Sequence, residues 1–155
     1  MSVRADAETF RGIPIFAGCD PVHLQLLAFS SVRQAFAAGD VVIKQGMRGG
    51  AAYLILNGRA DVAAGDVKVG SAGPGAMLGE VAMIGDAAYA VTARASEPLT
   101  AARIDRSLFM RIASEYPEFG TAVFAALSRK LDGALDDLTQ VQDLFDKGKT
   151  FRTVR

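Results

Sequence analysis

The sequence predicts a mainly β domain, a barrel or a sandwich, with helices before and after it. Residues 32–105 consist of short β-rich runs that glycine-containing turns interrupt every several residues, and helical signals stand on either side. The chain has 155 residues, 50% of them hydrophobic, so it can form one core that buries roughly two thirds of its unfolded surface. We therefore expect a single domain.

The elements follow in order from local signals. Asp20 followed by Pro21 predicts a helix with an aspartate cap and proline in its first turn. Gly65-Asp66 is the clearest hairpin tip, between two β-rich runs. We expect strands at residues 41–43, 53–56, 60–62, 67–69, 91–93 and 101–104.

After residue 104 the apolar residues follow a helical period. Asp105 is placed to cap a helix that contains Phe109 and Ile112, and Pro117 is placed to start the last helix. Along the last helix, apolar side chains repeat at a and d positions of a heptad. We predict a parallel homodimer through Phe124, Leu127, Leu131, Leu138, Val141 and Phe145. The alternative is that the helix packs on its own barrel, which would explain part of the pattern.

A short segment that starts at Gly79 carries the strongest functional signal. Gly79 lets the backbone approach a ligand closely, and Glu80 can accept hydrogen bonds from the hydroxyls of a sugar. The amides of Val81 and Ala82 would open a helix whose N-terminus attracts an anion. Carboxylate and amides together indicate a nucleotide.

With the glycines at 39, 46 and 58, this segment resembles the cyclic nucleotide-binding domain family over roughly residues 10–145. The resemblance implies an eight-stranded antiparallel β jelly roll with a long C-terminal dimerisation helix. It divides residues 1–145 into N-terminal helices at 6–30, a β-roll at 32–104 and helices at 105–145. A basic, flexible tail at 146–155 follows. Gly79 and Glu80 match the glycine and the ribose-binding glutamate of the family.

Two positions depart from the family pattern. The proline and the phosphate-binding arginine of the family fall on Ala88 and Tyr89, so Tyr89 and Ala90 stand at an altered phosphate site. Arg94 lies five residues after Tyr89. It either replaces the family's arginine as a phosphate contact from another direction or is a solvated strand residue. In the family pattern, hydroxyl residues of the last helix bond the base of the nucleotide. The corresponding positions of this chain are apolar, which leaves Leu135 or Thr139 near the base.

Composition excludes several other classes. Lysine plus arginine equal aspartate plus glutamate at 17 each, so no global field attracts nucleic acid or an anionic membrane. The single histidine, His23, is expected on the surface, and one histidine with one cysteine cannot build a usual zinc site. We expect no enzyme activity and no cofactor or metal.

The remaining segments agree with a cytoplasmic regulator. The first residues contain acids and no apolar run, and the sequence has no stretch of 18 apolar residues, so we expect neither a secretory signal nor a membrane span. Cys19 is the lone cysteine, which fits a reducing compartment. The residues after the last helix are too few for a helix-turn-helix, so we expect no DNA binding.

These observations predict a stand-alone sensor of the cAMP or cGMP class that signals to an unknown protein partner through its last helix. Two alternatives stay open. One is a dimeric adaptor that has lost its ligand. The other is a binder of an uncharged nucleoside-like molecule, because Glu80 is present and the phosphate-binding arginine is replaced by Tyr89.

Overall fold

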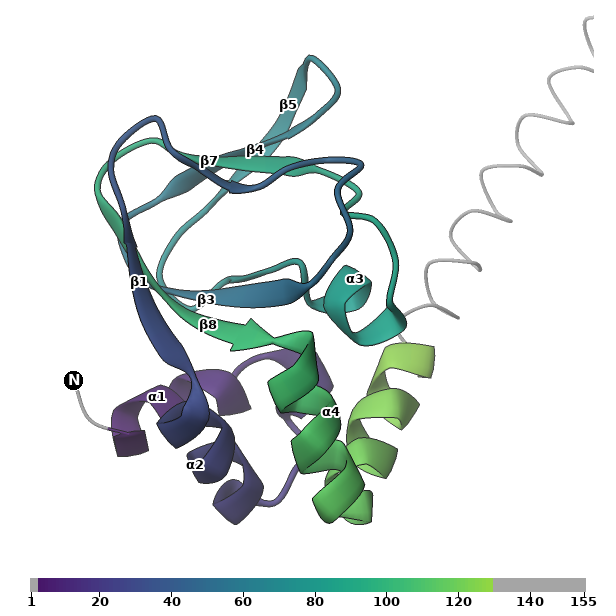
Figure 1. Cartoon of the computed structure of the whole chain (residues 1–155). Helices are drawn as coiled ribbons and strands as arrows, with labels where there is room; N and C mark the ends of the chain where they lie inside the picture. Colours follow the sequence, from purple (N-terminus) through teal and green to yellow (C-terminus); the bar gives the residue numbers. More distant parts are fainter. Residues whose placement is uncertain (1–2, 130–155) are drawn as a thin grey trace, which may run out of the picture.

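The computed structural model describes residues 3–129, in which helices pack beneath a two-sheet β-roll (Figure 1). Two α-helices and a 3-10 helix precede the strands, one short helix interrupts the strands, and further helices follow them. The helices are α1 (Val3–Arg11), the 3-10 helix η1 (Pro14–Phe16), α2 (Pro21–Ser30), α3 (Glu80–Gly85) and α4 (Arg106–Glu115), followed by a helix that starts at residue 117 and is described to residue 129.

Eight antiparallel strands form two four-stranded sheets, so the expected jelly roll is confirmed. The strands are β1 (Val32–Phe36), β2 (Val41–Ile43), β3 (Ala51–Asn57), β4 (Ala60–Ala64), β5 (Val67–Ala72), β6 (Met77–Leu78), β7 (Thr92–Ala95) and β8 (Leu99–Asp105). One sheet has the order β1-β8-β3-β6, and the other has the order β2-β7-β4-β5.

All six strands expected from local patterns are present, with ends shifted by a few residues. The hairpin at Gly65-Asp66 is confirmed, because Ala64 pairs with Val67 across it and Gly65 takes a positive φ of 61°. The local patterns missed β1 and β6. Only Phe36 of β1 is buried, and β6 is two residues long, so neither carries a clear alternation.

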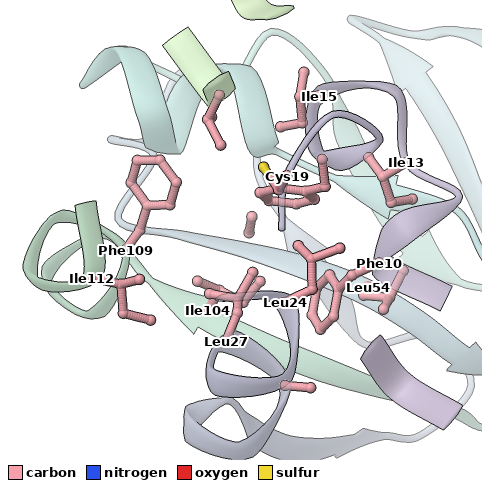
Figure 2. Close-up of a cluster of buried hydrophobic side chains, with 14 of the residues drawn as sticks. Phe10, Ile13, Ile15, Cys19, Leu24, Leu27, Leu54, Ile104, Phe109 and Ile112 are labelled. Carbon is pink, nitrogen blue, oxygen red and sulfur yellow. The ribbon is translucent and has the colours of Figure 1, made fainter. Parts of the chain in front are cut away.

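The sheet β1-β8-β3-β6 lies between two cores, because its central strands are buried on both faces. Tyr53 and Ile55 of β3 face the interior of the roll, whereas Leu54 and Leu56 face the helices. The helix-side core joins side chains from α1, α2, α4 and β8, as Figure 2 shows for Phe10, Leu24, Leu27, Ile104 and Phe109. This sheet therefore separates the interior of the roll from the helix-side core.

The helix starts were partly as expected. Asp20 caps α2 by accepting a hydrogen bond from the backbone nitrogen of Val22 at 2.9 Å, which confirms that prediction. Asp105 occupies the cap position of α4, but the prediction that its side chain caps the helix is wrong. Its carboxylate accepts a 2.8 Å hydrogen bond from Arg103 instead. The N-terminal helix begins at Val3, before the expected limit of residue 6.

His23 is buried, so the expectation of a surface histidine is wrong. It retains 7% of its exposure and packs against Tyr116, with 4.9 Å between ring centroids, and against Phe119. The helix that starts at residue 117 covers it, which the local sequence around α2 could not reveal.

Two of the predicted dimer positions fall within the described residues and differ in exposure. Phe124 is 43% exposed, whereas Leu127 is buried in the core of its own chain. Leu131, Leu138, Val141 and Phe145 lie outside the described residues, as do the tail at 146–155 and the predicted base-contacting residues Leu135 and Thr139.

Candidate functional site

A pocket of about 280 Å³ opens beside α3, between that helix and the segment that leads into β7. This volume is slightly below the roughly 300–1,000 Å³ of typical small-molecule pockets. Six of the predicted ligand-binding residues line it together: Gly79, Glu80, Val81, Ala82, Tyr89 and Ala90. The sequence therefore identified residues that the fold brings to one cavity.

Local patterns did not identify the rest of the lining. The additional lining residues are apolar: Ile43, Met77, Leu78, Ala87, Ala88 and Val91. Ile43 ends β2 and is buried, so its strand pattern marked it as a core residue and gave no sign of a ligand site. Among the described residues that line the pocket, Glu80 is the only charged one.

Gly79 positions the start of α3. It adopts a left-handed conformation with φ 79°, which residues with a Cβ rarely take. A Cβ at this position would stand 2.6 Å from Cε1 of Tyr89. The glycine is therefore required by contact with the tyrosine ring as well as by the backbone turn.

Glu80 is half-buried in the first turn of α3. The helix is only six residues long, and the amide of Met83 already donates to the carbonyl of Gly79 at 3.0 Å. A helix this short has fewer aligned peptide dipoles than a long one, so its field on an anion is correspondingly smaller. The carboxylate of Glu80 is better suited to accept hydrogen bonds from sugar hydroxyls than this short helix is to bind an anion.

Tyr89 occupies the interior of the roll and keeps only 9% of its exposure. Its hydroxyl donates to the carbonyl oxygen of Ala51 at 2.5 Å and accepts from the amide of Ala51 at 3.3 Å. Burial raises the pKa of the phenol above its ordinary value of 10.0. The ring lines the pocket, whereas the hydroxyl is hydrogen-bonded to Ala51 of strand β3.

The segment around Tyr89 is held by the loop that precedes β3. The amide of Tyr89 donates to the carbonyl of Met47 at 2.8 Å, and the amide of Gly46 donates to the carbonyl of Tyr89 at 2.9 Å. Gly49 sits beneath α3, where a Cβ would lie 2.6 Å from the Cβ of Ala82. Gly49 was missed by sequence reasoning, because its role depends on a contact with a residue far along the chain.

The arginines on β7, β8 and α4 do not supply a cation to the pocket. Arg94 donates to the carbonyl of Gly39 at 2.7 Å on an exposed surface, which agrees with a solvated strand residue. Arg103 is held by Asp105, and this hydrogen bond raises the pKa of its guanidinium. Arg106 donates to backbone carbonyls of α3. None of the three lines the pocket.

Within residues 3–129, no cluster of three or more histidine, cysteine or acidic residues is arranged to hold a metal ion. In that same part of the chain, no helix has both the length and the apolar character of a membrane span.

Comparison with known proteins places this geometry in a family. A family model described as the cyclic nucleotide-binding domain matches residues 33–116, more than half of the chain. Among solved structures, a cyclic nucleotide-binding-like protein from Brucella abortus is 32% identical with a TM-score of 0.65, covering 71% of this chain and 98% of that one.

Curated relatives are regulatory or kinase proteins. The chain is 30% identical over 100 residues to a cAMP-dependent protein kinase regulatory subunit of Hypocrea atroviridis, which covers 64% of this chain and 22% of that protein. It is 36% identical over 87 residues to a cGMP-dependent protein kinase of Plasmodium berghei, which covers 55% of this chain and 10% of that protein. The chain thus spans a quarter or less of the length of these two relatives.

The contact between Gly79 and Tyr89 predicts that Gly79→Ala destabilises the fold more than a matched substitution. Gly75 also has a positive φ, 89°, but a Cβ there meets nothing within 4 Å. Gly75→Ala should cost about 1 kcal/mol from the backbone alone. Gly79→Ala should cost about 1–3 kcal/mol more, because the ring must shift. Urea unfolding measures both, and equal losses would contradict the contact.

The raised pKa of Tyr89 predicts a loss of stability in alkali. Above about pH 10 the unfolded chain releases the phenolic proton while the folded chain retains it, so the free energy of unfolding falls as pH rises towards the folded pKa. The maximum slope is about 1.4 kcal/mol per pH unit. Tyr89→Phe lacks this component, so urea unfolding from about pH 8 to about pH 11.5 should show the two proteins converging in stability. Parallel curves would mean that the phenol is not buried.

Proposed function

This chain belongs to the cyclic nucleotide-binding domain family, and on that basis we propose that it is a ligand-sensing regulatory domain of the cAMP or cGMP class. The observation that carries the proposal is the open pocket beside α3, lined by Gly79, Glu80 and the segment through Tyr89. If the domain were a ligand-free adaptor, its own side chains would be expected to fill this space. The proposal includes a cytoplasmic location and no catalytic step.

In this proposal Glu80 accepts hydrogen bonds from the ribose, and the segment of Ala88 and Ala90 lies along the cyclic phosphate. A charged contact with phosphate contributes about 1.5–3 kcal/mol. Because Tyr89 replaces the arginine, we expect binding roughly 10- to 150-fold weaker than a site with that cation would give. The physiological ligand would then act at a correspondingly higher concentration.

A second candidate ligand is favoured by the position of Tyr89. The phenol is buried and bonded to Ala51, and the lining residues contribute one negative charge and no positive charge. Such a pocket suits an uncharged molecule with a vicinal diol, such as a nucleoside. Such a ligand pairs its hydroxyls with Glu80 and places no unpaired anion in an apolar cavity.

We propose that the output is a change in the C-terminal helices, presented to a protein partner or within a homodimer. A ligand shifts these helices only through its different affinity for two arrangements. Phe124 is exposed on the last helix and supports such a surface, whereas Leu127 is covered within its own chain. The dimer seam would therefore rest on Phe124 and on the positions beyond residue 129.

Removal of the carboxylate tests both ligand classes. Glu80→Ala should weaken binding of cAMP, cGMP or adenosine roughly 10- to 150-fold, because the sugar hydroxyls lose a charged acceptor. Calorimetry at millimolar ligand measures this, with Glu97→Ala, an exposed acid in the bend before β8, as the control. Unaltered binding by Glu80→Ala, or no heat with the native protein for any of the three, would refute a ligand site here.

Restoring a cation separates the two candidates. Tyr89→Arg should raise the affinity for cAMP or cGMP by about 10-fold or more if the site accepts a cyclic phosphate, and it should leave adenosine binding without a gain. Tyr89→Phe is the control, because it removes the hydroxyl without adding charge. A pocket built for a nucleoside would show no gain for the cyclic nucleotides. Both variants should lose stability through the broken contacts with Ala51.

A further inference from the structure

We propose that Arg106 is a positioning residue that locks α3 to α4 and transmits the state of the pocket to the C-terminal helices. The inference rests on the proposed function for its regulatory meaning, but the link itself is a property of the ligand-free fold. It is based on contacts on the side of α3 away from the pocket.

The side chain of Arg106 caps the end of α3. Its Nη1 donates to the carbonyl oxygen of Ile84 at 2.8 Å and also to the carbonyl oxygen of Met83. These carbonyls belong to the last turn of a six-residue helix, where intrahelical donors are absent. A guanidinium near a helix C-terminus is favourable because it satisfies those oxygens and opposes the dipole.

The backbone of Arg106 is fixed to a different segment. It is the first residue of α4, and its amide donates to the carbonyl of Gly50 at 2.8 Å. The side chain is only 28% exposed, so water competes weakly for it. Arg106 therefore joins the start of α4, the end of α3 and the chain entering β3.

Asp86 extends this link to the pocket wall. It follows α3 in a left-handed conformation with φ 54°, and the chain then runs along the pocket from Ala87 to Val91. Its carboxylate accepts hydrogen bonds from Arg48 at 2.7 Å and 3.0 Å and lies 3.9 Å from Nε of Arg106. One cluster thus contacts the last turn of α3 and Asp86, which immediately precedes the segment that lines the pocket.

The polar link differs from the apolar contacts between the same helices. Met83 and Ile84 also pack in the core with Phe109 of α4. Apolar packing is non-directional, so it fixes the orientation of α3 on α4 less strictly than a hydrogen bond does. The Nη1 atom of Arg106 donates to both carbonyls, so a shift of α3 must either move α4 or break these two hydrogen bonds.

From α4 the shift reaches the last helix. Phe109 packs against Phe119, with 5.6 Å between ring centroids, and against Phe124, with 6.2 Å. Gly120 of the last helix lies against Ala113 of α4, and a Cβ on Gly120 would stand 3.2 Å from the Cβ of Ala113. The glycine therefore lets the two helices approach closely. A change at the pocket can therefore arrive at the surface of the last helix through packed residues.

Hydrogen exchange of the full chain tests the link without ligand. In Arg106→Met, which keeps the apolar stem and removes the guanidinium, amides 83–87 should exchange about tenfold faster or more than in the native protein. Arg48→Met makes the same charge change and also contacts Asp86, but it bonds no carbonyl of α3, so it should leave those amides within about twofold. If Arg106→Met unfolds, Arg106→Gln serves, because its shorter, uncharged side chain cannot place a donor where Nη1 lies. Native-like exchange at α3, or equal effects of Arg106→Met and Arg48→Met, would overturn the proposal.

Adding millimolar cAMP or cGMP tests transmission. In the native protein and in Arg48→Met, ligand should slow exchange in α3 and change it in α4 and residues 117–129. In Arg106→Met, the slowing in α3 should remain while the change in the later helices is lost. Persistence of that later change would overturn the proposal, since a purely structural arginine would alter stability alone. If no native amide responds to these two ligands or to millimolar adenosine, the proposed function fails, and the ligand-free comparison alone decides whether Arg106 links the helices.

Discussion

The hydrogen bonding of the Tyr89 phenol to the backbone of Ala51 is the interaction on which the site depends. Strand β6 pairs with β3 only at Tyr53 and Leu54, so it ends before Ala51. The hydroxyl of Tyr89 takes the place of a strand partner for both the amide and the carbonyl there. Leaving two buried backbone groups unpaired would cost about 1–3 kcal/mol each. The same ring packs on Gly79, so β3, α3 and the pocket segment form one unit.

This arrangement gives the pocket two different sides. On the ligand side, Glu80 supplies one acceptor in an otherwise apolar lining. On the far side, the carbonyls that end α3 are bonded by Arg106 and so joined to α4. Glu80 is the only charged residue among the described residues that line this pocket, and we propose that it is the contact for a sugar. The replacement of the family's phosphate-binding arginine by Tyr89 leaves the hydrogen bonds between α3 and Arg106 in place.

Much of the fold could be predicted from the sequence because its signals are local. Glycine turns, the Asp20 cap and the Gly65-Asp66 hairpin each depend on neighbouring residues, and all appear in the structure. The errors arose where a contact with another part of the chain decides the position of a side chain. Asp105 was expected to cap α4 but pairs with Arg103, and His23 was expected on the surface but is covered by Tyr116 and by Phe119 of the last helix. The site shows the same division. Gly79 and Glu80 were identifiable from a motif, whereas Gly49, the burial of Tyr89 and the role of Arg106 depend on contacts with residues far along the chain.

Tyr89 is thus held in place by Ala51, and we propose that the ligand is bound by Glu80 at the start of α3. A crystal structure of the native protein with cAMP bound tests this most directly. We expect density for the nucleotide beside α3, with sugar hydroxyls on Glu80 and the Tyr89 hydroxyl still bonded to Ala51. A structure in which Tyr89 leaves Ala51 and its hydroxyl contacts the phosphate, or in which the nucleotide lies outside this pocket, would contradict it.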